Sequence, residues 1–225
     1  MPAYRTQELS AATWPDFEKL FSRGHGWDFC WCMAFQQTQR ASRKQFRTRA
    51  EVSVVNHRNK LALVDQGRAH GILVYADGEP IGWCQYGPSD ELHAMRGAPP
   101  ADSTQRLWRV TCFVVDLKYR RQGVAGLALR AALESIQRQG GGLVEAYPVA
   151  IWSHGRDASP GAVYVQGVGP VGPAHGGFGN VSTSGTVSMF EKQGFEAIAV
   201  CGSASPRVRA LGASGCQVLM RKAIG

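Results

Sequence analysis

Residues 107–149 restrict the fold of this chain more than any other stretch. An apolar segment, LWRVTCFVV (107–115), is followed by a basic turn, by an apolar helical segment that a glycine cluster closes, and by a second apolar segment, LVEAYPV (143–149). A strand, a helix and a strand in this order form a right-handed crossover between two parallel strands. We therefore predict an α/β fold in which the two apolar segments are parallel strands.

The turn before the helix combines positive charge with small residues. Its sequence is RRQGVA (120–125), so Arg120 and Arg121 directly precede Gly123 and Ala125. Amides at a helix start lack intrahelical acceptors and favour anions, and small residues allow a close approach to the backbone. Guanidinium groups add charge-assisted hydrogen bonds. A pyrophosphate fits this turn better than a single carboxylate, and a solvated helix start with two exposed arginines is the alternative.

Other phosphate motifs are absent from the sequence. No G-x-x-x-x-G-K-[ST] string occurs, and the glycines at 123 and 126 do not form a dinucleotide fingerprint. The net charge of +8 favours an anionic partner such as a polyphosphate cofactor, an acidic substrate or nucleic acid, although solubility alone would also account for it.

Composition and cysteine usage indicate a soluble, reduced protein. No run of about 18 uncharged apolar residues is present, so no membrane span is expected, and the first residues do not resemble a secretory signal. A cytoplasmic location is therefore expected. The six cysteines are expected to be reduced, and the C-x-C spacing of Cys30 and Cys32 is not that of a zinc site, so no metal is expected.

Periodicity and turn residues predict the remaining elements. Residues 27–35, WDFCWCMAF, are dense in aromatic and sulfur-containing side chains and are expected to form core or a pocket wall. Residues 152–185 are rich in glycine and are expected to be a long loop without regular structure. The other predicted elements are a helix over 13–24 that Thr13 caps and Gly24 ends, one or two helices over 40–66, a hairpin around Asp77–Gly78, a short helix over 186–195 and two paired final strands (195–201 and 216–223).

Basic residues gather in the segment 40–49. Arg40, Arg43, Lys44 and Arg47 share one face if this segment is helical. A solvated basic surface is one interpretation, and a face that binds an anion such as RNA is the other.

The order of elements and two motifs resemble the GNAT superfamily of acyl-CoA-dependent N-acetyltransferases. The first motif is the family string [QR]-x-x-G-x-[GA] between an apolar strand and an apolar helix, present here as CFVVDLKYRRQGVAGLALRAAL with Arg120, Gly123 and Ala125 at its three defining positions. The second is the late string MFEKQGFEAI. The resemblance covers about residues 68–222, and the Gly-rich segment accounts for the wide spacing of the two motifs.

The resemblance implies a fold and a co-substrate. The fold would be a mixed, splayed central sheet flanked by helices, in a single domain over 1–225 with an insertion at 152–185. Acetyl-CoA, or another short acyl-CoA, would be the co-substrate. Its pyrophosphate would lie on the amides of residues 122–125 beside the two arginines, and its pantetheine arm would pair with the preceding strand. The implied contact residues are Phe113, Val114, Val115, Arg120, Arg121, Gln122, Gly123, Val124 and Ala125.

The catalytic residues of the family are only partly present. Phe190 stands where the family often has the tyrosine that protonates the leaving thiolate, and Thr183 replaces a common asparagine. Ser188 and Tyr147 are the candidate acids, and departure of the thiolate without an acid is an alternative. Glu145 is the candidate base, with an ordinary ion pair as its alternative.

Several weaker candidates complete this set. Asp116, Glu91 and His93 are other candidate bases, and Cys112 is expected to be a buried strand cysteine rather than a nucleophile.

The resulting prediction is transfer of an acetyl or small acyl group from CoA to a primary amine by direct attack. A small-molecule amine is the expected acceptor, and an aminoacyl-tRNA bound through residues 40–49 is an alternative. A non-catalytic acyl-CoA sensor on the same fold is a further alternative, and a homodimer is compatible with the sequence.

Overall fold

The computed structural model describes most of the chain in segments. The described residues are 3–23, 28–36, 48–94, 98, 101, 104–153, 163–165, 169–171, 184–203 and 213–225. They form two compact units, one of Met1–His93 with Cys112–Ser135 and one of Ala94–Thr111 with Ile136–Gly225. Strand β4 (Leu107–Val115) and helix α3 (Val124–Arg138) each pass from one unit to the other.

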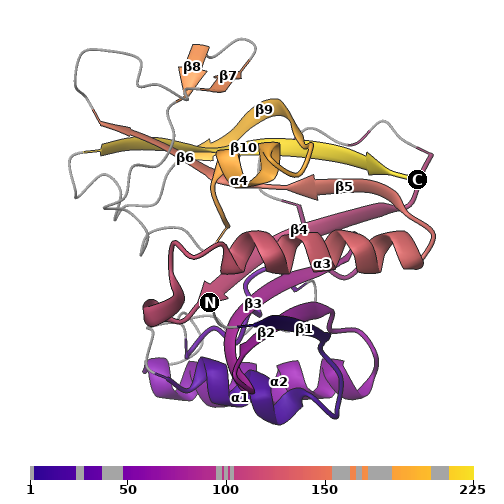
Figure 1. The fold of residues 1–225 in the computed structure, drawn as a ribbon, viewed down its shortest axis with the longest axis vertical. Coiled ribbons are helices and arrows are strands. Elements are labelled where there is room, and N and C mark those ends of the chain that lie inside the picture. The colour runs from indigo at the N-terminus through magenta and orange to yellow at the C-terminus, as the bar shows by residue number, and fades with distance from the viewer. Residues whose placement is uncertain are drawn as a thin grey trace. The chain divides into compact units, whose positions relative to one another are not determined.

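The first unit is an antiparallel sheet between helices. Its strands lie in the order β1 (Tyr4–Glu8), β2 (Gly71–Ala76), β3 (Glu79–Pro88) and β4. Helices α1 (Trp14–Phe21) and α2 (Arg49–Asp65) lie on one side of this sheet and α3 on the other (Figure 1). The short helix η1 (Leu117–Tyr119) follows β4.

The β2–β3 connection is the predicted hairpin. Asp77 and Gly78 have φ values of 49° and 83°, and Ala76 pairs with Glu79. Two central residues with positive φ are the requirement of a type I′ turn, which matches the twist of the flanking strands. The Asp-Gly pair therefore places β2 and β3 side by side in the sheet.

Aromatic side chains form the core between α1 and the sheet. The rings of Phe17 and Phe21 lie 4.3 Å apart, and the ring of Phe17 meets that of Trp83 edge-on at 4.8 Å. Trp31 and Cys32, from the segment 28–36, are buried in the same cluster. The aromatic segment is therefore part of the core of the first unit.

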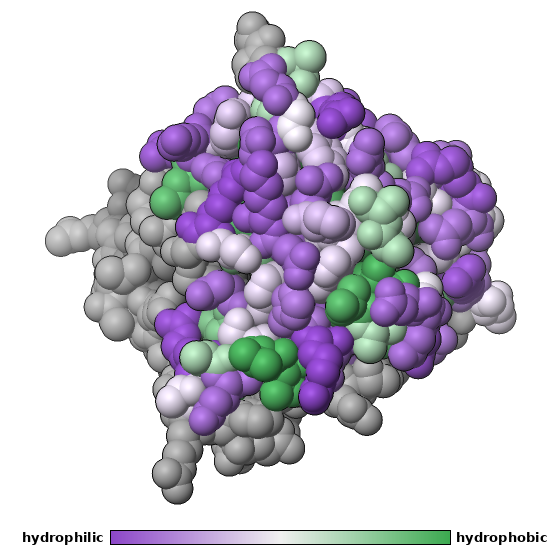
Figure 2. Space-filling model, turned by 90° about the horizontal axis from the view of Figure 1, so that it is seen from below, coloured by the Kyte–Doolittle hydropathy of each residue, from purple (hydrophilic) through white to green (hydrophobic). Residues whose placement is uncertain are grey.

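The side of α1 and α2 that faces solvent is mostly polar. In Figure 2, which views the molecule from below Figure 1, hydrophilic residues dominate and the hydrophobic residues are scattered. Val54 of α2, which is 69% exposed, is one large apolar side chain on the surface. The arrangement agrees with helices that bury one face against the sheet.

The second unit is built around the long strand β10 (Ala213–Ile224). Its strands follow the order β4, β5 (Gly142–Ala146), β10 and β6 (Val149–Ser153), and β9 (Glu196–Ser203) pairs with β10. All pairs of β10 are antiparallel. The remaining elements are β7 (Val163–Val165), β8 (Gly169–Val171) and α4 (Val187–Glu191).

The predicted parallel crossover is present in this unit. β4 and β5 pair in parallel, from Leu107 opposite Leu143 to Val110 opposite Ala146. β5 ends there, whereas β4 continues to Val115. The second half of β4 therefore has no partner on β5, as a splayed sheet requires.

Several predicted boundaries are wrong. Helix α1 ends at Phe21, before Gly24, and Thr13 makes no side-chain cap, because its hydroxyl donates to the Glu8 carbonyl at 2.9 Å. The second crossover strand ends at Ala146, because the chain starts a new strand, β6, after Pro148. The segment 152–185 contains regular structure, namely the end of β6 and the β7–β8 pair.

The start of α2 shows a signal that the sequence analysis missed. The Thr48 hydroxyl accepts from the Glu51 amide at 3.2 Å, and the Glu51 carboxylate accepts from the Thr48 amide at 3.0 Å. This capping box fixes the beginning of the helix at Arg49. The basic residues predicted between 40 and 47 lie outside the described residues.

Within the described part of the chain, no helix is long and apolar enough to span a bilayer.

Candidate active site

The basic turn lies at the end of β4, where the backbone changes direction twice. Arg121 and Gly123 have φ values of 59° and 81°. Helix α3 then begins at Val124, and the Leu127 amide donates to the Gly123 carbonyl at 2.9 Å. The first amides of a helix lack intrahelical acceptors, so this turn presents hydrogen-bond donors at the positive end of α3.

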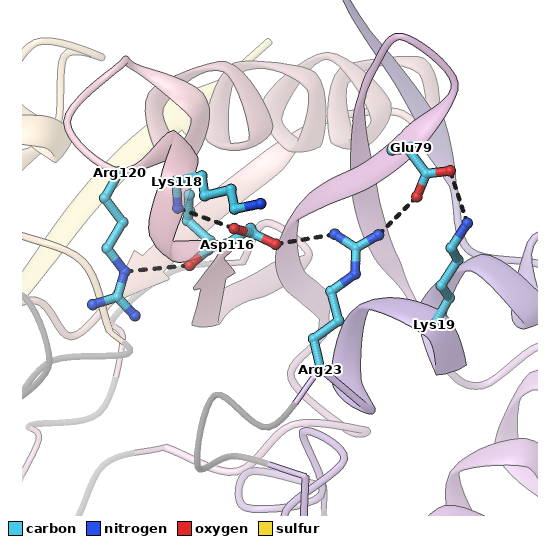
Figure 3. A network of polar contacts seen from close by, with 7 residues as sticks. Lys19, Arg23, Glu79, Asp116, Lys118 and Arg120 are labelled. Carbon is cyan, nitrogen blue, oxygen red and sulfur yellow. Dashed lines mark hydrogen bonds and ion pairs between the residues drawn. The ribbon is translucent and has the colours of Figure 1, made fainter.

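Asp116 organises the approach to the turn (Figure 3). Its amide donates to the Ile81 carbonyl at 2.9 Å, and its carboxylate accepts from the Lys118 amide and from Arg23 Nη1, both at 3.0 Å. Both carboxylate oxygens are thus engaged, which favours a structural role over that of a base. Arg23 also reaches Glu79, and the ammonium of Lys19 lowers the pKa of the Glu79 carboxyl.

The polar side chains of the turn differ in burial and in their contacts. Arg120 is half-buried, and its Nε donates to the Val115 carbonyl at 3.3 Å, as Figure 3 shows. The Gln122 amide group donates to the Lys118 carbonyl at 2.8 Å and accepts from the Tyr4 hydroxyl at 3.1 Å. Arg121 is exposed. The turn therefore carries a half-buried Arg120, a hydrogen-bonded Gln122 and an exposed Arg121.

Open space lies beside the helix start. A Cβ added to Gly123 or to Gly126 would meet no atom within 4 Å. The side chains of Phe113 and Val114 are buried, and that of Val115 is half-buried. Ala125 is half-buried and Val124 is buried. All predicted cofactor-binding residues thus lie in the first unit, on β4 and on the turn that follows it.

Glu145 of β5 is the centre of a buried ion cluster in the second unit. Arg109 Nε lies 3.1 Å from its Oε2, and Arg221 reaches its Oε1 through Nε at 3.1 Å and Nη2 at 2.8 Å. Only 2% of Glu145 is exposed. Both oxygens of the carboxylate therefore accept from guanidinium groups, and the contacts favour the ion-pair interpretation over that of a base.

Tyr147 belongs to the same cluster. Its hydroxyl donates to Glu145 Oε2 at 2.8 Å and accepts from Arg109 Nε at 3.3 Å. Burial, together with the negative charge of Glu145, raises the pKa of the Tyr147 hydroxyl. A phenol whose proton is held in this way is a poor donor to a leaving thiolate, so its surroundings do not favour the predicted role.

We expect two tyrosines to ionise late in an alkaline titration. Burial and the hydrogen bond to Asp16 also raise the pKa of Tyr75. An unfolded tyrosine loses its proton near pH 10, whereas these two keep theirs, so the folded state loses stability as the pH rises above that value. Tyrosinate absorbance should show that Tyr75 and Tyr147 ionise only on unfolding. Ionisation of all six tyrosines in the folded protein would contradict the expectation, and Tyr75→Phe or Tyr147→Phe should each remove one late step.

The late family motif lies in and after α4. Phe190 is fully buried, and its ring meets that of Phe195 edge-on at 5.0 Å. Ser188 is half-buried, and its hydroxyl lies 3.4 Å from that of Thr186, the N-cap of α4. Ser188 is therefore the candidate acid that stands outside the buried ion cluster. Thr183 lies outside the described residues.

The weaker candidate bases have other partners. The Glu91 carboxylate lies 3.3 Å from His70 Nε2. The ring of His93 stacks on that of Phe35 at 5.6 Å, and its amide donates to the Phe35 carbonyl. Both residues lie in the first unit. His93 contacts Phe35 of the segment 28–36, whereas Glu91 lies against His70, which precedes β2. No group of metal-ligating side chains occurs among the residues that the structure describes.

The sequence analysis missed the two arginines that hold Glu145. Arg109 carries the only charge within LWRVTCFVV, and Arg221 lies in an apolar segment near the C-terminus. An arginine inside an apolar strand is buried and must find an anion. This signal indicates that each arginine needs an anion nearby, but it does not identify Glu145 as that anion.

A mixed sheet with a parallel crossover is the architecture of an α/β protein, and a helix that starts at a basic turn has the chemistry to accept a phosphate. The comparison with protein families is more specific. Residues 6–151 match the model of the acetyltransferase (GNAT) family. The chain therefore belongs to this family, as its sequence predicted, and it is an acyl-CoA-dependent N-acetyltransferase. No match was found among curated protein sequences.

Solved structures share the fold at low sequence identity. A GCN5-related N-acetyltransferase from Kribbella flavida superposes with a TM-score of 0.52 at 14% identity, over 99% of this chain and 98% of the other. A ribosomal-protein-alanine N-acetyltransferase from Brucella melitensis gives a TM-score of 0.49 at 13% identity, over 98% and 99% of the two chains. The first of these confirms the predicted fold class, a mixed α/β sheet flanked by helices.

Proposed function

We propose that this enzyme transfers an acetyl group from acetyl-CoA to a primary amine, with the CoA pyrophosphate bound at the turn 120–125. The observation that carries the proposal is the anchored basic turn at the start of α3. Helix-start amides, which lack intrahelical acceptors, lie there with a half-buried Arg120 and an exposed Arg121, beside open space. A doubly charged pyrophosphate satisfies more of these donors than a single carboxylate does.

The pantetheine arm is proposed to lie along the second half of β4. This half continues past the last pair with β5, so its edge is not used by that strand. An extended amide chain can pair with such an edge as an added strand would. The thioester would then be held by the backbone near Phe113 and Val115, and position rather than a covalent intermediate would promote the reaction.

The amine is proposed to attack the acyl carbonyl directly, with release of the CoA thiolate. A thiol with an ordinary pKa near 8.5 is a good leaving group. The reaction therefore does not require a tyrosine at position 190, where this chain has phenylalanine. Ser188 remains the candidate donor to the thiolate. Glu145 remains a candidate base only if it gives up a guanidinium contact, and water is the alternative proton acceptor.

Acetyl-CoA should stabilise the folded protein in a thermal shift experiment. At a ligand concentration one hundred times Kd, the stabilisation is about 2.7 kcal/mol. The matched control is an acetyl thioester of N-acetylcysteamine, which carries the acyl end of the co-substrate without its pyrophosphate. We expect a rise in Tm with acetyl-CoA and none with the short thioester. An equal shift in Tm with the two ligands would contradict binding through the phosphates.

A non-catalytic sensor of acyl-CoA is the second candidate, and the buried Phe190 favours it. Release of free CoA thiol in the presence of a panel of amines distinguishes the two. An enzyme releases thiol with at least one amine, whereas a sensor binds acetyl-CoA tightly and releases none.

The acceptor and the assembly are proposed from the sequence. A small amine is the proposed acceptor, and aminoacyl-tRNA bound through the segment 40–49 is the alternative. RNA affinity that falls steeply with salt would favour the second. A single domain over 1–225, a homodimer and a cytoplasmic location are likewise predictions from the sequence.

A further inference from the structure

Two thiols from distant parts of the chain meet in the core of the first unit. Cys32 lies in the segment 28–36 and Cys112 lies on β4, 80 residues further along the chain. Their Sγ atoms are 3.1 Å apart. A disulfide needs about 2.05 Å, so a movement of about one ångström would join them.

The backbone around Cys32 is held in an unusual conformation. Trp31 and Cys32 have φ values of 47° and 49°, which bulky residues adopt only when their surroundings compel it. The contacts that hold this backbone conformation involve Cys32 itself. Gln85 Nε2 donates to its carbonyl at 2.9 Å, and Trp83 Nε1 donates to its sulfur at 3.2 Å. The contacts therefore direct the Cys32 sulfur toward β4 against a local backbone preference.

A buried lysine lies beside the two thiols. Lys60 of α2 is fully buried, and its Nζ has no hydrogen-bond partner among the described residues. Burial lowers the pKa of Lys60, while the neighbouring Cys32 and Cys112 raise it. In the other direction, burial raises the pKa of Cys32 and the charge of Lys60 opposes that effect. The pKa of Cys32 nevertheless stays above its ordinary value, so Lys60 reduces but does not reverse the cost of forming the thiolate, which is the form that reacts with oxidants.

We infer that Cys32 and Cys112 are a redox modification site, at which a peroxide converts the two thiols into an intramolecular disulfide. Cys112 is the more exposed of the two, at 9% against 2%, and therefore reacts with the peroxide first. Its sulfur attacks hydrogen peroxide and displaces hydroxide. The hydroxide takes up the thiol proton, so the products are a sulfenic acid and one water. The Cys32 sulfur then attacks the sulfenic sulfur and releases a second water. Two thiols are oxidised and one peroxide is reduced.

Other cysteines lie close enough to serve as comparisons. Cys84 of β3 is also buried, its sulfur lies 4.0 Å from the Gln85 carbonyl, and burial together with the neighbouring Cys32 raises the pKa of its thiol. Cys30 is half-buried in the same segment as Cys32. The 3.1 Å sulfur contact joins Cys32 to Cys112, so a disulfide between these two is the specific expectation.

The test is oxidation of the full-length protein with stoichiometric hydrogen peroxide, followed by thiol titration in denaturant and peptide mapping without reductant. We expect the free thiols to fall from six to four, the mass to fall by two hydrogens, and one cross-linked peptide pair to contain Cys32 and Cys112. Dithiothreitol should restore all thiols. Six free thiols after oxidation, or a different pair of cysteines in the cross-link, would overturn the inference.

Variants test the two partners and the lysine. Cys112→Ala should keep every remaining thiol free under the same oxidant, whereas Cys84→Ala, the matched buried control, should still lose two. Lys60→Met keeps most of the length of the side chain and removes the charge, so disulfide formation should slow several-fold. An unchanged rate of disulfide formation in Lys60→Met would show that the lysine does not promote the reaction. The thiol count involves no acyl-CoA, so its result is independent of the proposed function.

Discussion

An aspartate in place of Gly123 should abolish binding of acetyl-CoA while the protein remains folded. Gly123 has a φ of 81°, and a Cβ at this position would meet no atom within 4 Å. Aspartate and asparagine are the L residues that accept a positive φ most readily. The new carboxylate would lie beside the proposed pyrophosphate. Because like charges in contact cost several kcal/mol, we expect Kd to rise at least about 100-fold.

Gly123→Asn is the matched control for this change. It has the same size and the same backbone preference but no charge, so its Kd for acetyl-CoA should rise only a few-fold. Calorimetric titration with CoA and the KM for acetyl-CoA measure the effect, and Tm without ligand confirms that both variants fold. Equal affinities of the aspartate and asparagine variants would place the pyrophosphate somewhere other than on this turn.

The parallel crossover could be predicted from the sequence because its determinants are local. The apolar run 107–115 becomes β4 without a change of boundary, and the glycines after Arg138 adopt positive φ and end α3. Asp77 and Gly78 specify the hairpin in the same way. Each of these features depends on a few adjacent residues whose backbone preferences agree with the fold.

The interior of each unit could not be predicted in the same way. Arg109, Glu145 and Arg221 come from three separate strands, and only the register of β4, β5 and β10 brings them together. Cys32 and Lys60 likewise meet through packing of segments that have no shared pattern. Such contacts depend on tertiary packing, so residue types alone could suggest Glu145 as a base but could not reveal that its oxygens are occupied.

Removal of the Glu145 carboxylate should destabilise the second unit strongly. Only 2% of Glu145 is exposed. Glu145→Ala therefore removes a buried anion and leaves the guanidinium groups of Arg109 and Arg221 without their partner. Loss of one partner from a buried ion cluster costs about 3–5 kcal/mol. For a chain of this size the Tm should fall by roughly 6–20 °C. Glu134→Ala, which removes an exposed carboxylate from α3, should leave the Tm nearly unchanged.

Glu145→Gln separates the structural role from the catalytic one. The amide keeps the size of the side chain but lacks the charge, so an anchoring role predicts a lower Tm and a turnover per folded molecule close to that of the unchanged protein. A base predicts the reverse, namely an unchanged Tm, a large loss of kcat and the disappearance of a titrating group from the pH profile of kcat/KM. Because Arg109 and Arg221 already engage both carboxylate oxygens, we expect the first result. The second would mean that the cluster opens when the amine binds.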